Sequence, residues 1–376
     1  MRANRREFIK IGACAGATAM AGPPAGGAPA ADGLGVAASL PVPDGAEFLN
    51  MAGAYAALIT PYRTDGSVNE EMIERVVEYG IANGLAGFYL TGSTGEGLLL
   101  SSDERTLVYR RAVKAARGRA KLIAHVGCTA TDDAVALARR AAQAGVDWVS
   151  STAPVYFGQG FDSAFEYYKA VSSATDLPFM IYSVGAQLVP ERDVRLFELP
   201  NVKGMKYTGY AYWTVKQLRR ILPKPAVFFA GADEQELCAF AYCDTFSGCI
   251  GTTDNIIPAH HAKICRLAAQ GRFREAAPLM DEVVRLVELV VNVPNASYWK
   301  SAMRYIGLDC GPARSPAGRP LSESEYQSYA ARLDALGFIE RGGAMRSATA
   351  LAAAGRPDGS VGDPGNQQNE RMVCHE

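Results

Sequence analysis

Eight short apolar runs, each followed by an amphipathic helical segment, constrain the fold of this chain more than any other feature. The predicted strands cover residues 54–61, 87–92, 121–127, 148–154, 178–185, 202–208, 226–231 and 247–255. The predicted helices cover residues 69–84, 101–117, 131–145, 161–176, 191–199, 212–222, 233–243 and 258–271. Eight such units in about 220 residues favour an α/β fold closed into a (β/α)8 TIM barrel over an open doubly wound sheet. No Gly-x-Gly-x-x-Gly follows the first strand, which weakens a dinucleotide-binding alternative.

The N-terminal segment differs from the rest of the chain. Arg5 and Arg6 precede Phe8, Lys10 and a weakly apolar stretch, and "PPAGGAPAAD" follows. A basic region, an apolar region and an Ala-Pro-Ala sequence are the parts of an export signal. We therefore predict a signal peptide of the twin-arginine type over residues 1–31 and a periplasmic or secreted location. The alternative is a disordered basic N-terminus.

The remaining chain divides into three predicted parts. The barrel domain covers residues 50–271, and a C-terminal extension over residues 272–340 carries three more helical segments near 273–292, 295–307 and 322–338. Residues 341–376 are polar and rich in Gly and Pro, which predicts a disordered tail. The extension follows the eighth unit and does not repeat the strand–helix pattern.

Charge and composition exclude several classes of function. The net charge is −1 and 48% of residues are hydrophobic, as in ordinary globular proteins with a sizeable core. No basic run suggests nucleic acid, and no apolar run approaches the roughly 18 residues of a membrane span. The eight cysteines show no Cys-x-x-Cys pair and no Cys/His metal spacing, so we predict free core thiols and no metal site.

Polar side chains gather where the predicted strands end. In a (β/α)8 barrel these ends meet at one face, where the chemistry takes place. We therefore expect one cavity to be lined by Ser93, Thr94, Tyr156, Tyr182, Lys206, Thr208, Asp233, Glu234 and Thr252.

Lys206 is the most informative of these residues. It lies inside "NVKGMKYTGY" with no acidic residue beside it in sequence, and a buried lysine is costly unless it is paired or neutral. A neutral amine can attack a ketone to form an imine, which withdraws electrons so that a neighbouring C–C bond can break. The alternative is a structural lysine paired with Glu96 or Asp254.

The neighbouring residues suit the same chemistry. Tyr182 on the fifth strand can move protons beside the lysine. The backbone N–H groups of the Gly-rich turn "TGSTGEG" can hold a carboxylate. Together they indicate a 2-oxo acid substrate, with a ketone for Lys206 and a carboxylate for the turn.

Three histidines are interpreted without catalysis or metal. His260 and His261 are adjacent on a predicted helix and point in different directions, so we expect a solvated helix face. We interpret His125, on the third strand, as a core histidine with satisfied hydrogen bonds. No His/Asp/Glu cluster with ligand spacing stands at the strand ends, which disfavours a metal-dependent aldolase.

From about residue 54 to residue 340 the chain resembles the dihydrodipicolinate synthase / N-acetylneuraminate lyase family of lysine-dependent class I aldolases. The resemblance rests on "ALITP", "GSTGE", "KLIAHVG", "APVYF", "MIY", "GMKYT", "GADE" and "GTTDN", in that order. "GSTGE", "KLIAHVGC" and "GADE" are closer to the N-acetylneuraminate lyase branch.

The resemblance implies a role for each matching residue. Lys206 matches the Schiff-base lysine and Tyr182 the catalytic tyrosine. Ser93 and Thr94 match the pair that binds the carboxylate and assists proton transfer, and Tyr156 matches a relay tyrosine inserted across a subunit contact. Positions that line the pocket and bind the distal part of lyase substrates are matched by Ala57, Thr208, Gly231, Asp233, Glu234 and Thr252.

The chain departs from the family pattern after the fifth strand. Ser183 and Gly185 stand where the family has Asn and Pro. Only 24 residues separate Tyr182 from Lys206, about four fewer than in the two best-known branches. No arginine stands in this shortened loop, where Gln187 is the nearest polar residue. These departures disfavour a synthase role and leave cleavage of sialic acid itself open.

The sequence thus predicts an exported Schiff-base lyase or aldolase that makes or consumes pyruvate or releases it from a sugar acid. It would need no cofactor beyond the imine through Lys206, and the resemblance implies a homo-oligomer, a tetramer or dimer. One alternative is a dehydratase or hydratase-aldolase that uses the same imine. Another is a non-catalytic periplasmic small-molecule binding protein on the barrel scaffold.

Overall fold

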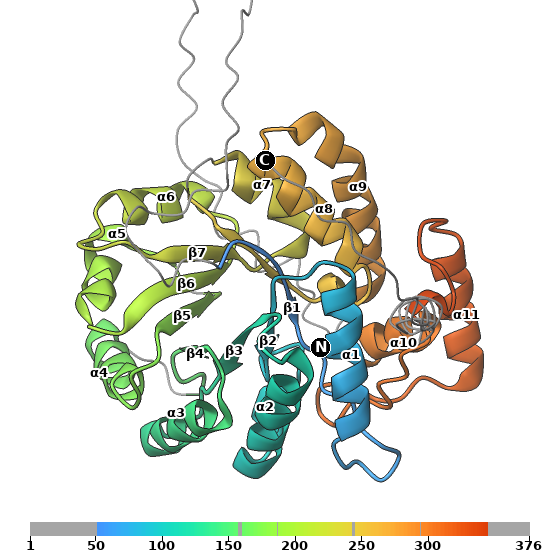
Figure 1. Cartoon of the computed structure of the whole chain (residues 1–376), viewed down its shortest axis with the longest axis horizontal. Coiled ribbons are helices and arrows are strands. Elements are labelled where there is room, and N and C mark those ends of the chain that lie inside the picture. The colour runs from blue at the N-terminus through green and yellow to red at the C-terminus, as the bar shows by residue number, and fades with distance from the viewer. Residues whose placement is uncertain (1–50, 157–159, 186, 243–244, 294, 345–376) are drawn as a thin grey trace, which may run out of the picture. The chain divides into compact units, whose positions relative to one another are not determined.

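A computed structural model describes residues 51–344, except 157–159, 186, 243–244 and 294. The predicted signal peptide lies outside the described residues, and so does all of the predicted tail beyond residue 344. The described residues form eight parallel strands that close into a barrel in the order β1-β2-β3-β4-β5-β6-β7-β8 (Figure 1). The predicted (β/α)8 TIM barrel is therefore confirmed. The strands are β1 Gly53–Ala57, β2 Gly87–Leu90, β3 Lys121–His125, β4 Trp148–Ser151, β5 Phe179–Val184, β6 Val202–Thr208, β7 Val227–Ala230 and β8 Gly248–Gly251.

A helix follows each strand and covers the outside of the barrel (Figure 1). Several helices begin at caps that the sequence encodes. In α2, Ser101 and Glu104 form a reciprocal capping box, which satisfies two backbone N–H groups at the helix start. The helices are α1 Glu70–Ala82, α2 Ser102–Ala116, α3 Thr131–Ala144, α4 Phe161–Ser172, α5 Pro190–Asp193, α6 Tyr212–Arg220, α7 Glu236–Ala241 and α8 Pro258–Ala269.

The alternation of side chains along the strands divides the buried residues into two layers. Inward-facing side chains fill the barrel with a small cluster that includes Tyr55, Tyr89, Tyr182 and Phe229. Outward-facing side chains such as Met205 join a larger core between the barrel and the helices. A residue's position in its strand therefore decides whether its side chain reaches the interior.

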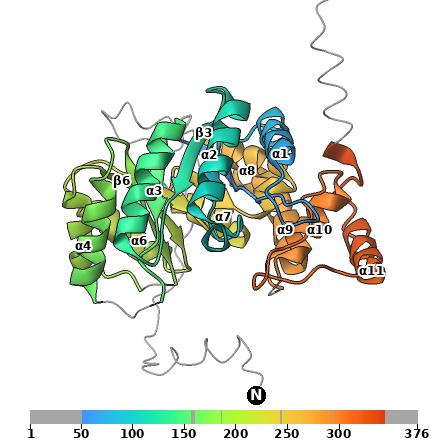
Figure 2. The same cartoon turned by 90° about the horizontal axis from the view of Figure 1, so that it is seen from below.

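The C-terminal extension forms three further helices, α9 Phe273–Val290, α10 Ser297–Tyr305 and α11 Glu323–Asp334. Helix α9 packs against α8, and α10 and α11 follow at the same side of the barrel (Figure 2). The buried Lys300 of α10 lies 2.8 Å from a carboxylate oxygen of Glu96, in the loop after β2. Its ammonium group also donates to the carbonyl of Pro312 at 2.9 Å. The extension is thus joined to a loop at the carboxyl end of the barrel.

Two predictions from composition can be compared with the described residues. No helix among them is long and apolar enough to cross a membrane. The described cysteines are free thiols, and Cys249, Cys265 and Cys310 are buried as expected. Cys238, by contrast, is exposed, because it lies on the outer face of α7.

Candidate active site

Lys206 lies inside the barrel, where its side chain is only 4% exposed. Its Nζ atom is 4.6 Å from the ring centre of Tyr89 and 4.5 Å from that of Tyr182. Among the described residues no carboxylate forms an ion pair with it. Glu96 pairs with Lys300 and Asp254 with His261, so the predicted alternative of a structural ion pair is wrong.

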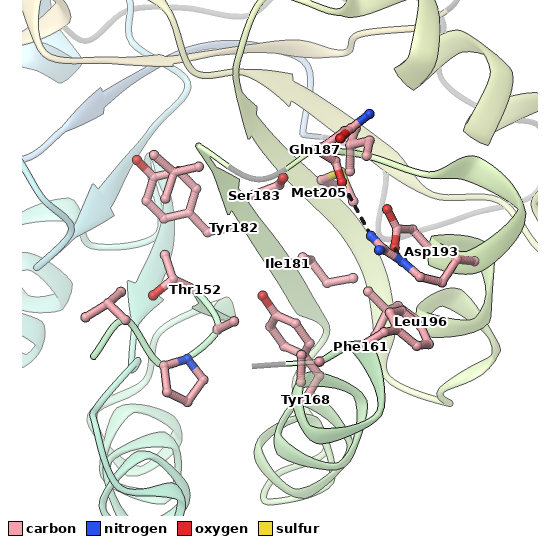
Figure 3. A pocket seen from close by; sticks show the side chains of 18 residues that line it. Thr152, Phe161, Tyr168, Ile181, Tyr182, Ser183, Gln187, Asp193, Leu196 and Met205 are labelled. Atoms are coloured by element: carbon pink, nitrogen blue, oxygen red, sulfur yellow. Dashed lines mark hydrogen bonds and ion pairs between the residues drawn. The ribbon is translucent and has the colours of Figure 1, made fainter. Parts of the chain in front are cut away.

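The pairing of β5 with β6 brings Tyr182 to the lysine. Tyr182 and Lys206 are direct partners in the parallel ladder, so both side chains point into the barrel. The ring of Tyr182 packs edge-on against that of Tyr89, with ring centres 5.7 Å apart. Figure 3 shows Tyr182 and its neighbour Ile181 on opposite sides of β5. The amine therefore lies between two aromatic rings, an environment with little water.

The end of β7 approaches Thr208 and Lys206 so closely that residue 231 is best accommodated as a glycine. A Cβ atom at Gly231 would lie 3.0 Å from Cε of Lys206 and 2.1 Å from Oγ1 of Thr208. Thr208 donates a hydrogen bond to the carbonyl of Gly231 at 3.2 Å. Gly231 and Thr208 therefore lie beside Lys206, as their positions at the ends of the strands predicted.

The turn after β2 has an unusual backbone. Thr91 and Glu96, at its two ends, have φ angles of 51° and 55°, which non-glycine residues rarely adopt. The turn is held by Thr60, which donates to the carbonyl of Gly95 at 2.7 Å, and by the Glu96–Lys300 pair. Among the described residues no acceptor is found for the backbone N–H of Ser93 or Thr94. Such N–H groups form a binding place for an anion.

Two threonines connect the loops after β2 and β8. The hydroxyls of Thr94 and Thr252 are 2.8 Å apart. Asn255 supports this contact, because its side-chain amide donates to the carbonyls of both Ala57 and Thr252. The structure thus brings Thr94 and Thr252 together and places Ala57 at the adjoining end of β1. Ser93 lies beside them in the turn and is exposed.

The two acids after β7 have different surroundings. One carboxylate oxygen of the buried Asp233 accepts from the backbone N–H and the hydroxyl of Thr253, both at 2.7 Å. Asp233 therefore holds the loop after β8 in place. Glu234 lies at the rim and accepts from the hydroxyl of Tyr210 at 3.4 Å.

Tyr156, a predicted catalytic residue, does not reach the barrel interior in the single chain. It lies in the loop after β4, where 78% of it is exposed. Its strand-end position does not direct the side chain into the barrel, because the chain has already left β4. If Tyr156 has the role that the resemblance implies, its side chain would enter the active site of a neighbouring subunit.

His125 is a buried polar centre below the site, as the sequence predicted. Its ring nitrogens face Nη2 of Arg105 at 3.3 Å and the backbone N–H of Thr152 at 3.3 Å. Burial lowers the pKa of His125 to about 3, with further lowering by the charges of Arg105 and Lys206. The imidazole is therefore neutral at ordinary pH.

A cavity of about 570 Å³ opens next to β5, where the loop is short (Figure 3). Tyr182 and Ser183 line its inner side, and the buried Oγ of Ser183 has no hydrogen-bond partner. Arg192 of α5 lies on its wall, although no arginine was expected in the shortened loop. Its guanidinium pairs with Asp193 at 2.7 Å and is therefore already neutralised.

The interpretation of His260 and His261 as a solvated helix face is wrong. His261 is fully buried and lies 2.7 Å from a carboxylate oxygen of Glu236, and the partly buried His260 pairs with Glu282 at 2.9 Å. The reason is that α8 packs between β1 and α9, so position 261 faces the interior of the protein and contacts Glu236.

Sequence analysis missed Tyr89 and Asn255. Tyr89 lies on β2, just before the Gly-rich turn, and its side chain points into the barrel. The alternation of side chains along this strand could have predicted that orientation. The contact of Asn255 with Ala57 joins residues 198 positions apart, and no local pattern could predict it.

Comparison with known proteins agrees with this geometry. Residues 50–336 match the model of the dihydrodipicolinate synthetase family. The chain is 32% identical to an N-acetylneuraminate lyase of Rhizobium meliloti (strain 1021) over 272 residues, which cover 71% of this chain and 90% of the relative.

Solved structures of similar proteins have the same fold. An N-acetylneuraminate lyase of Fusobacterium nucleatum superposes with a TM-score of 0.71 at 28% identity, over 77% of this chain and 100% of the other. A dihydrodipicolinate synthase of Bacillus anthracis gives 0.71 at 26% identity, over 77% and 99%.

The neutral state of His125 predicts a pH dependence of stability. Its folded pKa of about 3 lies below the ordinary value of 6.5, so the unfolded chain binds a proton that the folded chain does not. Stability should be full above pH 6.5 and fall toward pH 3, at about 1.4 kcal/mol per pH unit from this group. Urea unfolding at pH 6.5 and 4.5 should show a shallower decline for His125→Gln than for the wild type. Equal declines would contradict a neutral His125.

Proposed function

The chain belongs to the dihydrodipicolinate synthetase family, and from this premise we propose that it is a lysine-dependent lyase or aldolase acting on a 2-oxo acid, with pyruvate as product or substrate. The observation that carries the proposal is the buried amine of Lys206, which lies between Tyr89 and Tyr182 without an ion-pair partner among the described residues. An amine in such surroundings is a nucleophile for a ketone.

In the proposed reaction Nζ of Lys206 attacks the ketone carbon, and loss of water gives a protonated imine. In the cleavage direction the bond between C3 and C4 breaks, its electron pair moves into an enamine, and the aldehyde leaves. The enamine takes a proton at C3 and water hydrolyses the imine, which releases pyruvate and the free lysine. Synthesis follows the same steps in reverse.

Tyr182 is the proposed proton carrier, because the β5–β6 ladder holds it beside Lys206. The family resemblance supports Thr94 as a second member of this proton path, and its contact with Thr252 holds its hydroxyl in place. The backbone N–H groups of Ser93 and Thr94 are the proposed carboxylate site, which would fix the 2-oxo acid with its ketone toward the amine. Tyr156 would join this relay only from a neighbouring subunit.

The distal part of the substrate remains the variable part of the proposal. Relatives are named N-acetylneuraminate lyases, which supports a sugar acid or a similar hydroxylated chain. Polar groups for the distal part of the substrate would come from Thr208, Glu234 and Thr252. One carboxylate oxygen of Asp233 already accepts two hydrogen bonds from Thr253. Tyr182, the ladder partner of Lys206, also lines the cavity beside the short loop after β5, where a different aldehyde partner would lie in this proposal. A dehydratase that expels water from the same imine is the second candidate.

We further propose that the chain is exported and assembles as a homo-oligomer. Export is supported by Arg5 and Arg6 before the apolar segment, and self-association by the exposed Tyr156 at the strand-end face.

Borohydride reduction in the presence of pyruvate should trap a covalent adduct on Lys206. Intact mass and peptide mapping should find the adduct in the wild type and not in Lys206→Ala. The matched control is Lys203→Ala, because Lys203 lies on the same strand facing outward and should leave the adduct unchanged. A folded wild type without adduct would refute imine chemistry and favour the non-catalytic binding protein.

Exchange of the methyl protons of pyruvate in D2O should report the role of Tyr182 without a known partner substrate. Imine–enamine interconversion requires proton transfer at C3, so Tyr182→Phe should slow the exchange measured by NMR roughly 10²–10⁴-fold. Tyr55→Phe, which changes another tyrosine of the barrel interior, should keep nearly the full rate. A Tyr182→Phe enzyme that exchanges at the wild-type rate would exclude this tyrosine as proton carrier.

Native mass spectrometry of the protein from a bacterial periplasmic fraction should find an oligomer whose chains lack about the first 31 residues. Replacing Arg5 and Arg6 together by lysine should keep the protein in the cytoplasm. An intact N-terminus in the exported protein would contradict a cleaved export signal. A monomer would contradict the proposed homo-oligomer.

A further inference from the structure

A second cluster of reactive side chains lies outside the barrel, behind β8. Glu236, Cys249 and His261 each offer a ligand atom, and these atoms all lie within 4.8 Å of one another. All three side chains are buried. Cys249 faces outward from β8, whereas Lys206 faces the barrel interior, so this cluster is separate from the imine site.

Two more side chains complete the cluster. Cys265 lies one turn after His261 on α8, so both face β8. Its Sγ atom is 3.9 Å from that of Cys249 and 3.2 Å from a carboxylate oxygen of Glu236. Asp254 lies next to the same atoms, 3.8 Å from Cys249 Sγ.

The spacing of these atoms fits a tetrahedral metal centre. Bonds of about 2.0–2.3 Å from zinc to N, O and S ligands place neighbouring ligand atoms about 3.3–3.8 Å apart. The corresponding distances here are 2.7 Å between His261 Nδ1 and Glu236, 3.2 Å between Cys265 and Glu236, and 3.9 Å between the two sulfurs. The ligand atoms of Glu236, Cys249 and His261 lie up to 4.8 Å apart, so these side chains and that of Cys265 would have to move inward to surround one ion.

Carboxyl groups outnumber basic groups among the described residues of the cluster. Glu236, Asp254 and Asp233 are three buried carboxyl groups; Glu236 and Asp254 contact His261 directly, whereas Asp233 is linked to it through Thr253. Oδ2 of Asp254 is fully buried and has no hydrogen-bond partner among the described residues. It lies 3.8 Å from Nδ1 of His261, on the side of the candidate ligands. A buried carboxyl oxygen without a hydrogen bond is costly unless a positive charge lies near it, and a bound cation beside His261 would supply one.

His261 is also oriented as a metal ligand would be. Its Nδ1 faces the cluster, and its Nε2 lies 3.0 Å from the hydroxyl of Thr253. That hydroxyl donates to Asp233 at 2.7 Å. A ligating histidine commonly donates its second ring N–H to such a chain, which fixes the ring and its tautomer.

We infer that Glu236, Cys249, Cys265 and His261 form a structural site for a zinc-like transition-metal ion. Two thiolates and an imidazole select zinc over magnesium or calcium, and four protein ligands leave no open position for catalysis. Through His261, Thr253 and Asp233, the ion would stabilise the loop after β8 that carries Thr252.

Metal content and the cobalt spectrum of the reduced full-length protein test this inference. Because the cluster is buried, Zn²⁺ or Co²⁺ is offered both to the folded protein and during refolding. We expect one tightly held equivalent of zinc, and with cobalt a thiolate-to-metal charge-transfer band and the visible bands of a tetrahedral ion.

Matched variants assign the ligands. Cys249→Ser and His261→Gln should remove the charge-transfer band or alter it and weaken binding more than about a hundredfold. Thr253→Val, which changes only the hydroxyl behind His261, should weaken binding roughly 10- to 100-fold. Cys310→Ser, a buried thiol elsewhere, and Cys238→Ser, an exposed thiol, should leave both readouts unchanged.

Failure of the folded, reduced wild type to take up zinc or cobalt by either route would overturn the inference. So would metal-free protein in which Cys249 and Cys265 are joined in a disulfide, or cobalt binding that survives Cys249→Ser and His261→Gln unchanged. None of these outcomes depends on pyruvate trapping, so the imine proposal and the metal inference can fail independently.

Discussion

The burial of a lysine amine away from carboxylates is the constraint on which the candidate site depends. Lys206 reaches the barrel interior because its ladder partner is Tyr182, and the close approach of β7 beside it favours a glycine at residue 231. The acids that could have neutralised it are bound elsewhere, Glu96 by Lys300 and Asp254 by His261. The two acids therefore have partners other than Lys206, and its amine lies between two aromatic rings, an arrangement suited to a nucleophile.

The architecture and most of the site could be predicted because their signals are local. Eight apolar runs with helical spacers specify a closed barrel, and strand-end positions placed Thr94, Lys206 and Thr252 at one face. The same reasoning does not hold for Tyr156, because a position near a strand end does not determine the direction of a side chain that lies in the following loop. Substrate binding by Asp233 stays a prediction, and the contact of one of its carboxylate oxygens with Thr253 is a feature that sequence does not reveal.

The cluster behind β8 was missed for a different reason. Metal sites are recognised in sequence when ligands repeat at short spacing, but Glu236, Cys249 and His261 come from α7, β8 and α8. The separation of His261 and Cys265 by one helical turn is a local signal, but two residues of this kind on one helix do not by themselves indicate a metal site. Ligands that converge from three elements become visible only after the strand and both helices have been placed in space.

The ion pair between Glu96 and Lys300 has a consequence for how this protein could evolve. Glu96 ends the turn proposed to hold the substrate carboxylate, and Lys300 belongs to the extension that follows the barrel. Loss of α10 would leave the Glu96 carboxylate buried without its cation, at a cost of about 3–5 kcal/mol. The extension is therefore not a module that recombination could exchange freely between barrels. It would have to be inherited together with the turn, as a single unit of selection.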